Sequence, residues 1–162
     1  MKEYEVEIAY KLIDRAKMRL VLGLMFGKSC IFCKIVRKQA PASIIYEDES
    51  TIVFLDLRPL NVGHTLVIPK AHYVDIFDIP EKELSQMHKV SKLISIAVKK
   101  VTKADGISII QQNGKGAGQD IFHIHVHVVP RFEGQKLPPF NELMEVERAK
   151  LDEMAKKIKQ EL

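Results

Sequence analysis

The segment from His123 to Val129 constrains the fold of this chain more than any other part of the sequence. It reads His-Ile-His-Val-His-Val-Val, so polar and branched apolar residues alternate strictly. Alternation with a period of two is typical of a β-strand, because successive side chains point to opposite faces of a sheet. We therefore expect Ile124, Val126 and Val128 to enter a core, while the three histidines line the opposite face of a half-buried strand.

A row of three imidazoles on one rigid strand predicts chemistry rather than a plain solvated surface. Three of the six histidines of the chain fall within residues 123–127. An uncharged imidazole acts as a nucleophile, a proton carrier or a metal ligand near neutral pH. The spacing leaves two interpretations open: a metal site built from the row, or nucleophilic catalysis by one histidine that its neighbours orient. For catalysis we expect His125 to attack, because it has a histidine on each side.

Short apolar runs separated by turn residues predict further strands. These runs lie at 44–46, 52–55, 65–68 and 107–111. A central helix is expected to begin after Pro80 and to continue to about Val101, because apolar residues recur there at helical spacing. Strands grouped around a central helix, with short turns between most of them, indicate an α+β fold with a mainly antiparallel sheet.

Helical periodicity also marks both ends of the chain. Residues 5–24 repeat apolar side chains every four positions, which predicts an N-terminal helical extension over residues 1–27. After two prolines, Asn141 is expected to cap a final helix that runs through Leu162. The predicted inner positions of this helix are Leu143, Val146, Lys150 and Met154.

Composition limits the classes of function. A chain of 162 residues with 46% hydrophobic and 28% charged residues suits one globular domain. Its net charge of +4 is spread along the sequence, which favours small anionic ligands over a nucleic-acid partner. No apolar run approaches the ~20 residues that span a bilayer, so no membrane partner is expected. The two cysteines form one C-x-x-C pair, which argues against a secreted disulfide scaffold. We expect a cytoplasmic protein.

The histidine segment resembles the defining motif of the histidine triad (HIT) family of nucleotide hydrolases and transferases. Other segments follow in the order and spacing of that family, so the resemblance covers about residues 28–135. These segments are Cys30–Val36, Ile45–Asp48, Phe54–Asp56, Gly63–Lys70 and Gly118–Gln119. The pattern is closest to the adenosine phosphoramidase-like (Hint-type) branch. The resemblance implies a mainly antiparallel five-stranded sheet with a central helix, in a catalytic domain over residues 28–162.

The resemblance also implies roles for the histidines. It makes His125 the nucleophile and places His127 in the network that orients it. His64 matches a histidine that lies beside the nucleotide in the family. We therefore expect His125, His127 and His64 to serve catalysis.

A second group of residues is expected to bind the nucleotide. Asp56 matches a carboxylate that accepts hydrogen bonds from both ribose hydroxyls. Asn113 and Gln119 flank a glycine-rich loop and match positions that contact phosphate, where glycines let backbone N–H groups approach closely. Asp120 stands where several relatives have Ser or Thr, whose hydroxyl helps to protonate the leaving group. An aspartate could do so only with a raised pKa. The apolar slot for the base is expected from Ile31, Phe32, Ile35 and Phe54.

The Cys30-x-x-Cys33 pair has half of a zinc-ligand spacing. Alone, the pair is also compatible with a redox pair or with two buried small residues. The resemblance implies a structural zinc ion that these cysteines hold together with His72 and His123. Such a site is closed and non-catalytic, and it would brace the strand that carries the nucleophile.

The leading hypothesis is therefore an enzyme that acts on purine nucleotides. His125 is expected to attack the α-phosphorus of a nucleoside phosphoramidate or a dinucleoside polyphosphate, after which water releases the monophosphate from a covalent nucleotidyl-histidine. The second hypothesis is nucleotidyl transfer to a sugar phosphate or another acceptor. The third is a nucleotide-binding scaffold protein with little activity. A homodimer is expected, because pairing two sheets covers an edge strand.

Overall fold

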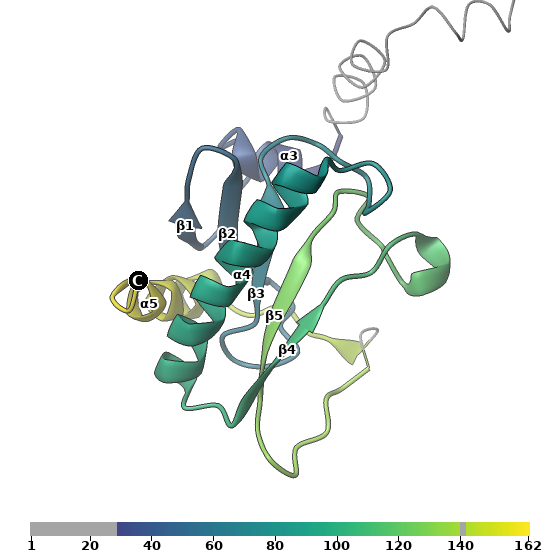
Figure 1. The fold of residues 1–162 in the computed structure, drawn as a ribbon. Coiled ribbons are helices and arrows are strands. Elements are labelled where there is room, and N and C mark those ends of the chain that lie inside the picture. The colour runs from purple at the N-terminus through teal and green to yellow at the C-terminus, as the bar shows by residue number, and fades with distance from the viewer. Residues whose placement is uncertain (1–28, 140–141) are drawn as a thin grey trace, which may run out of the picture.

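The computed structural model describes residues 29–139 and 142–162, which form an α+β domain (Figure 1). In chain order the elements are α3 (Ile31–Val36), β1 (Ile44–Glu47), β2 (Thr51–Leu55), β3 (Thr65–Pro69), α4 (Glu81–Thr102), β4 (Gly106–Ile110), the 3-10 turn η1 (Lys115–Ala117), β5 (Val126–Arg131) and α5 (Arg148–Lys159). The helix predicted for the N-terminal extension lies outside the described residues. None of the helices described is both long and apolar enough to cross a membrane.

The strands form one antiparallel sheet in the order β1-β2-β3-β5-β4, which confirms the predicted fold class. The last strand in sequence, β5, lies between β3 and β4, so the histidine-bearing strand is inside the sheet (Figure 1). Ile44 pairs with Phe54, and Phe54 pairs with Leu66. Leu66 pairs in turn with His127. Residues directly opposite each other share a face, so this row of four side chains crosses one face of the sheet from β1 to β5.

Helices α4 and α5 cover the other face of the sheet (Figure 1). As predicted, α4 begins directly after Pro80. Its apolar residues recur at helical spacing, so they form a stripe that packs on β2, β3 and β5. The buried residues of this helix are Met87, Val90, Ser91, Ile94, Ala97 and Val98. Ile124, Val126 and Val128 are fully buried in the same core, as the alternation predicted.

The short helix α3 covers part of the opposite face and closes a second, smaller core. Phe32 and Ile35 of α3 pack there against apolar side chains of β2 and β3. The strand residues in this core are Ile52, Phe54, Leu66 and Ile68. Strands β2 and β3 are therefore buried on both faces, which explains why their sequences are nearly continuous apolar runs.

The histidine strand is shorter and more buried than the sequence predicted. The ladder of β5 begins at Val126, so His123 and His125 precede it. The N–H of Ile124 donates to the carbonyl of Tyr73 at 2.8 Å instead of pairing with a strand. The histidines do not lie on a solvated face, because Phe32 packs edge-on against His123 and His125 with ring centroids 5.8 Å and 5.3 Å apart.

The C-terminal helix begins later than predicted. It starts at Arg148 instead of Asn141, because the chain before it runs along the loop that follows β2. There the N–H of Val146 donates to the carbonyl of Leu57 at 2.9 Å. Because the helix starts later, a different face of it is buried. The prediction that Lys150 faces the core was therefore wrong, and its side chain is exposed. The residues of α5 buried in the core are Leu151, Ala155 and Ile158.

Candidate functional site

A cavity of about 910 Å³ lies on the α3 side of the sheet, where His125 and His127 form part of its lining. The row from Phe54 through Leu66 to His127 forms its floor. The residues expected to form the base slot all line it, namely Ile31, Phe32, Ile35 and Phe54. Its polar side chains are Asp56, Arg58, Gln112, Asp120, Glu145 and Arg148. The cavity therefore joins an apolar region to the two histidines through a polar rim.

The orientation of His125 follows from its own backbone. Its Nδ1 lies 2.7 Å from the carbonyl oxygen of His123, and a carbonyl only accepts, so Nδ1 carries the proton. In the neutral ring the lone pair is then on Nε2, the nitrogen expected to attack. Only 2% of the His125 side chain is exposed. A buried, neutral imidazole with a fixed tautomer is the state that nucleophilic attack requires.

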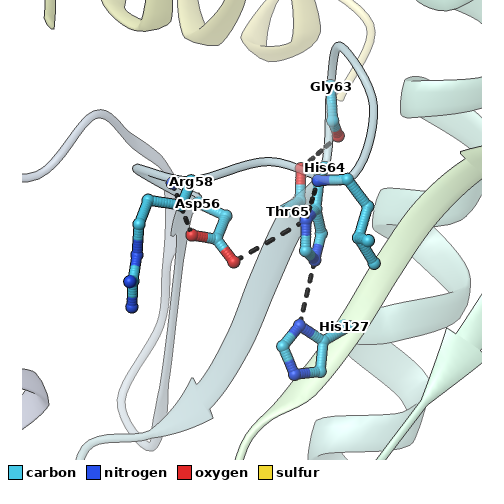
Figure 2. Close-up of polar contacts among 7 residues, drawn as sticks. Asp56, Arg58, Gly63, His64, Thr65 and His127 are labelled. Carbon is cyan, nitrogen blue, oxygen red and sulfur yellow. Dashed lines mark hydrogen bonds and ion pairs between the residues drawn. The ribbon is translucent and has the colours of Figure 1, made fainter. Parts of the chain in front are cut away.

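His127 obtains its tautomer from His64 through a chain that starts at the backbone (Figure 2). The N–H of Leu60 donates to Nδ1 of His64 at 3.0 Å, so that nitrogen is an acceptor. The proton of neutral His64 is then on Nε2, which donates to Nδ1 of His127 at 2.9 Å. The proton of neutral His127 is therefore on Nε2, on the side of the ring that points away from His64 (Figure 2).

Burial keeps the three rings uncharged. Burial, with smaller contributions from His127 and His125, lowers the pKa of His64 to about 3. Burial also lowers the pKa of His127 to about 4, with His125 adding to the effect and Asp120 opposing it. The pKa of His125 is lowered too, chiefly by burial, although its bond to the His123 carbonyl and the charge of Asp120 oppose this. All three histidines are neutral at pH 7.

The turn before β3 places His64. Gly63 has φ +87, and a Cβ there would lie 2.7 Å from Cγ2 of Thr102, so the position requires glycine. The N–H of His64 donates to the carbonyl of Asn61 at 3.0 Å. The Thr65 hydroxyl donates to the carbonyl of Gly63 at 2.9 Å (Figure 2). A tight, hydrogen-bonded turn thus directs the fully buried His64 ring toward β5.

Asp56 follows β2 and lines the cavity. Its Oδ1 accepts the N–H of Arg58 at 2.9 Å (Figure 2). Its Oδ2 lies 3.6 Å from Nδ1 of His64, but the two do not form an ion pair at neutral pH, because His64 is uncharged and that nitrogen already accepts from Leu60. Burial raises the pKa of Asp56 to about 6, and the neighbouring charge of Asp120 contributes.

The glycine-rich loop holds Asn113 and Gln119 away from the cavity in this structure. Oδ1 of Asn113 accepts the N–H of Ile76 at 3.0 Å. The Gln119 amide accepts from the N–H of Gly114 at 2.7 Å and donates to the carbonyl of Val74 at 2.6 Å. Neither side chain is among the described residues that line the cavity. Gly118 and the exposed Asp120 of the same loop do line it.

Four side chains that lie far apart in sequence converge beside α3, and they could hold a metal ion. Nδ1 of His123 lies 3.6 Å from Sγ of Cys30 and 3.5 Å from Sγ of Cys33. Nδ1 of His72 lies 3.3 Å from Sγ of Cys33. All four ligand atoms lie within 4.8 Å of one another. A tetrahedral zinc ion with ordinary Zn–S and Zn–N bonds separates its sulfur and nitrogen ligands by roughly 3.5 Å, so the donor set fits zinc.

The second nitrogen of His123 is committed elsewhere. Its Nε2 lies 2.9 Å from the carbonyl of Pro69, so Nε2 carries the proton and Nδ1 presents its lone pair to the cysteines. Contact with His123 and His72 lowers the pKa of the Cys30 thiol even though burial opposes this. Burial and the neighbouring Cys30 raise the pKa of Cys33.

The cavity is also lined by residues that no sequence pattern predicted. These are Leu57, Arg58, Leu66, Gln112, Leu143, Glu145 and Arg148 among others. Arg58 and Leu57 follow the expected ribose ligand Asp56 directly, which is a signal that sequence proximity could have provided. Glu145 and Arg148 belong to no motif, and only the path of the chain before α5 brings them to the cavity.

Comparison with known proteins identifies the family. The family model of the HIT domain matches residues 37–134, so the chain belongs to the histidine triad family, whose members bind nucleotides. An uncharacterised HIT-like protein from Methanocaldococcus jannaschii is 44% identical over 131 residues, which cover 80% of this chain and 98% of that protein.

Two further matches bear on chemistry. The adenylylsulfatase HINT3 of Arabidopsis thaliana is 42% identical over 104 residues, covering 64% of this chain and 53% of that protein. The crystal structure of a zinc-bound histidine triad family protein from Mycobacterium smegmatis superposes with a TM-score of 0.74 at 42% identity. That match covers 83% of this chain and 94% of the other chain.

Proposed function

We propose that this protein hydrolyses purine nucleoside phosphoramidates or dinucleoside polyphosphates at the α-phosphorus, through a covalent nucleotidyl-histidine. The main support for this proposal is that His125 is held in one tautomer. Its Nδ1–H is bound to the carbonyl of His123 at 2.7 Å, which leaves an unprotonated Nε2 on a residue that lines the cavity. The hydrolase HINT3, a relative in the same family, supports the same reaction class.

The first step forms the bond between Nε2 of His125 and phosphorus, while the bond from phosphorus to the leaving nitrogen or oxygen breaks. The leaving group takes the proton from Nε2–H of His127, which His64 keeps on that nitrogen. Asp120 stands where several relatives carry a hydroxyl, so in this chain protonation of the leaving group falls to His127. Water then attacks phosphorus and gives a proton back to Nε2 of His127, the bond between Nε2 of His125 and phosphorus breaks, and the nucleoside monophosphate leaves.

Substrate binding uses both parts of the cavity. Asp56 accepts hydrogen bonds from the ribose hydroxyls, and the apolar slot around Phe32 and Phe54 takes the base. Gly118 at the cavity lets the backbone approach the phosphate, while Asn113 and Gln119 shape the loop that presents it. Backbone donors and imidazoles can stabilise the transition-state charge without a catalytic metal ion.

We also propose that the protein binds a structural zinc ion. Cys30, Cys33, His72 and His123 would hold it, and when bound it supplies a cross-link between α3, the loop after β3 and the start of the histidine segment. His123 also provides the carbonyl that fixes His125. The metal site therefore braces the residue that positions the nucleophile.

We also propose that the protein forms a homodimer. Strand β4 is at the edge of the sheet, and its Ile109 is 46% exposed. Pairing of two copies along this edge would satisfy its free backbone groups and cover that side chain. Light scattering at micromolar concentration tests this: twice the chain mass is expected, and the mass of a single chain contradicts it.

Pre-steady-state kinetics tests the reaction. With a phosphoramidate whose amine is fluorescent, release of the amine in a burst of about one equivalent per chain, ahead of the monophosphate, supports a covalent intermediate. Addition of sugar phosphates distinguishes hydrolysis from nucleotidyl transfer, because a transferase would form a new nucleotidyl product. Tight nucleotide binding without release of either product would support the scaffold hypothesis instead.

A further inference from the structure

The segment 143–148 forms one wall of the cavity. Leu143, Glu145 and Arg148 line it, although the HIT domain match ends at residue 134. This wall is therefore built by a part of the chain beyond the matched family domain. It is anchored at two points: Val146 N–H donates to the carbonyl of Leu57 at 2.9 Å, and α5 is packed into the main core directly after it.

Arg148 and Glu145 offer complementary groups on this wall. Nη1 of Arg148 donates to Oγ of Ser43 at 3.3 Å, and that buried hydroxyl donates to Oδ1 of Asp152 at 2.6 Å. A guanidinium has five N–H donors, so the anchored side chain keeps donors available for a ligand. Glu145 is exposed and makes no hydrogen bond or ion pair within residues 29–139 and 142–162. Its carboxylate is an available acceptor.

The sheet determines which end of the nucleotide meets this wall. Ser43, which anchors Arg148, directly precedes Ile44 of β1, whereas His127 is on β5. The paired row from Ile44 to His127 spans three strand spacings, or roughly 14 Å. A nucleotide with its phosphorus at His125 and its ribose at Asp56, which follows β2, extends its base toward β1. Arg148 therefore lies at the base end of the cavity, and Glu145 is on the same wall, next to the bond between Val146 N–H and the carbonyl of Leu57.

We infer that Glu145 and Arg148 determine base specificity by reading the hydrogen-bonding edge of a purine, an inference that rests on the proposed function. Glu145 accepts from the exocyclic amino group of adenine, and Arg148 donates to N7. Adenine presents the amino donor beside the N7 acceptor, whereas a 6-oxo purine presents two acceptors. The carboxylate of Glu145 repels the second pattern, so the cavity prefers adenosine over inosine nucleotides.

Adenosine and inosine 5′-phosphoramidates differ at C6 and the adjacent ring nitrogen, and so provide a matched pair of substrates. We expect kcat/KM of the wild-type protein to favour the adenosine compound by roughly tenfold or more, the size of one hydrogen bond to a charged group. Glu145→Gln, whose amide both donates and accepts, reduces that preference to within about threefold. Arg148→Met lowers kcat/KM for both purines by about tenfold, because both carry N7, and leaves the cytidine compound unchanged.

Lys157→Met serves as the matched control, because Lys157 is exposed on the same helix and lies outside the cavity lining. We expect it to change none of these ratios. An adenosine-to-inosine ratio that stays the same in Glu145→Gln overturns the role of Glu145. An equal loss for purines and cytidine in Arg148→Met, together with a lower Tm, overturns the role of Arg148 and leaves it a purely structural residue.

Equilibrium binding separates this inference from the proposed function. If the wild-type protein turns over neither phosphoramidate, the proposed reaction is wrong. Calorimetry with AMP and IMP still tests whether Glu145 and Arg148 determine base specificity. Tighter binding of AMP that Glu145→Gln abolishes supports the inference. Equal affinity of the wild-type protein for the two monophosphates overturns it.

Discussion

Nε2 of His64 donates a 2.9 Å hydrogen bond to Nδ1 of His127, and the backbone N–H of Leu60 fixes the direction of that bond. One buried histidine thereby decides which nitrogen of its neighbour carries the proton. In the proposed mechanism His64 is a positioning residue, because it would act on the leaving group only through His127.

Replacing His64 tests whether it determines which nitrogen of His127 carries the proton. In His64→Ala, Nδ1 of His127 loses its donor, so the proton is no longer held on Nε2. We expect kcat for a phosphoramidate of a basic amine to fall by roughly 10²-fold, the range of a general-acid contribution. A substrate with an acidic phenol as leaving group should lose far less, because it needs little protonation. Steady-state assays of both substrates measure the difference.

His88→Ala is the control for that experiment, because His88 is exposed on α4. It should leave both rates unchanged. An equal loss for both substrates in His64→Ala would mean that His64 only supports the fold.

Asp56 should set the acidic limb of the pH profile. Its pKa is raised to about 6, mainly by burial, so the carboxylate loses an acceptor oxygen as the pH falls through 6. His127 has a pKa of about 4 and remains neutral in that range. We expect kcat/KM to decline below about pH 6 for ribonucleotides. A 2′,3′-dideoxy substrate, which has no hydroxyls to bind Asp56, should lack this limb, and a limb of equal size for both would assign it to another group.

The buried histidines should make stability depend on pH. The pKa values of His64 and His127 are about 3 and about 4 in the folded protein, both lowered mainly by burial, against about 6.5 when unfolded. Below pH 6.5 the unfolded chain binds more protons at these sites, so stability is full above that pH and falls as the pH drops toward 4. His125, whose pKa burial also lowers, acts in the same direction, whereas Asp56, whose pKa is raised, opposes it between about pH 6 and pH 4.

We therefore expect the free energy of unfolding in urea to be lower at pH 5 than at pH 7 by about 2 kcal/mol. In His64→Gln the loss between these pH values should be smaller, because one of the histidines whose pKa is lowered is gone. A loss of the same size in wild type and variant would show that His64 does not contribute.

The Gly63 turn gives a test of the fold around the site. Gly63→Ala forces a side chain into a positive φ and brings its Cβ to 2.7 Å from Cγ2 of Thr102. We expect a loss of about 1–3 kcal/mol in unfolding free energy. Gly116→Ala is the matched control, because a Cβ there meets nothing within 4 Å. Chemical denaturation measures the unfolding free energy of both variants. Equal stability of the two would contradict the conclusion that position 63 requires glycine.

Zinc should copurify with the protein in a ratio of about one ion per chain. Cys33→Ser should lose the ion and lower Tm by roughly 10 °C, because a structural zinc contributes to folding. Chelator treatment of the wild-type protein should do the same. Elemental analysis that finds no metal in protein purified without chelator would refute the zinc proposal.

Much of the architecture could be read from the sequence because local patterns control it. Alternation in the histidine segment placed Ile124, Val126 and Val128 in the core, and Pro80 marked the start of α4. The C-x-x-C pair and two histidines that lie far away in sequence converged as the family pattern implied. The first two features follow from local periodicity, whereas the convergence of the four metal-ligating side chains was implied only by the resemblance to the family.

Other features depend on tertiary contacts and left no local signal. The chain before α5 follows the loop after β2 through the Val146–Leu57 bond, so the periodicity there misplaced the helix start and the inward position of Lys150. The same path brings Glu145 and Arg148 to the cavity. The proton positions on the histidines are set by single carbonyl and N–H groups that no sequence pattern specifies.

Mass spectrometry of the protein quenched in acid-free denaturant during turnover tests the central claim most directly. We expect a nucleoside monophosphate adduct on the peptide that contains His125, located by fragmentation on that residue and absent in His125→Asn. That variant should still bind AMP, because the side chains of the apolar slot and Asp56 are unchanged. Turnover by His125→Asn at the wild-type rate, or an adduct on another residue, would contradict the account.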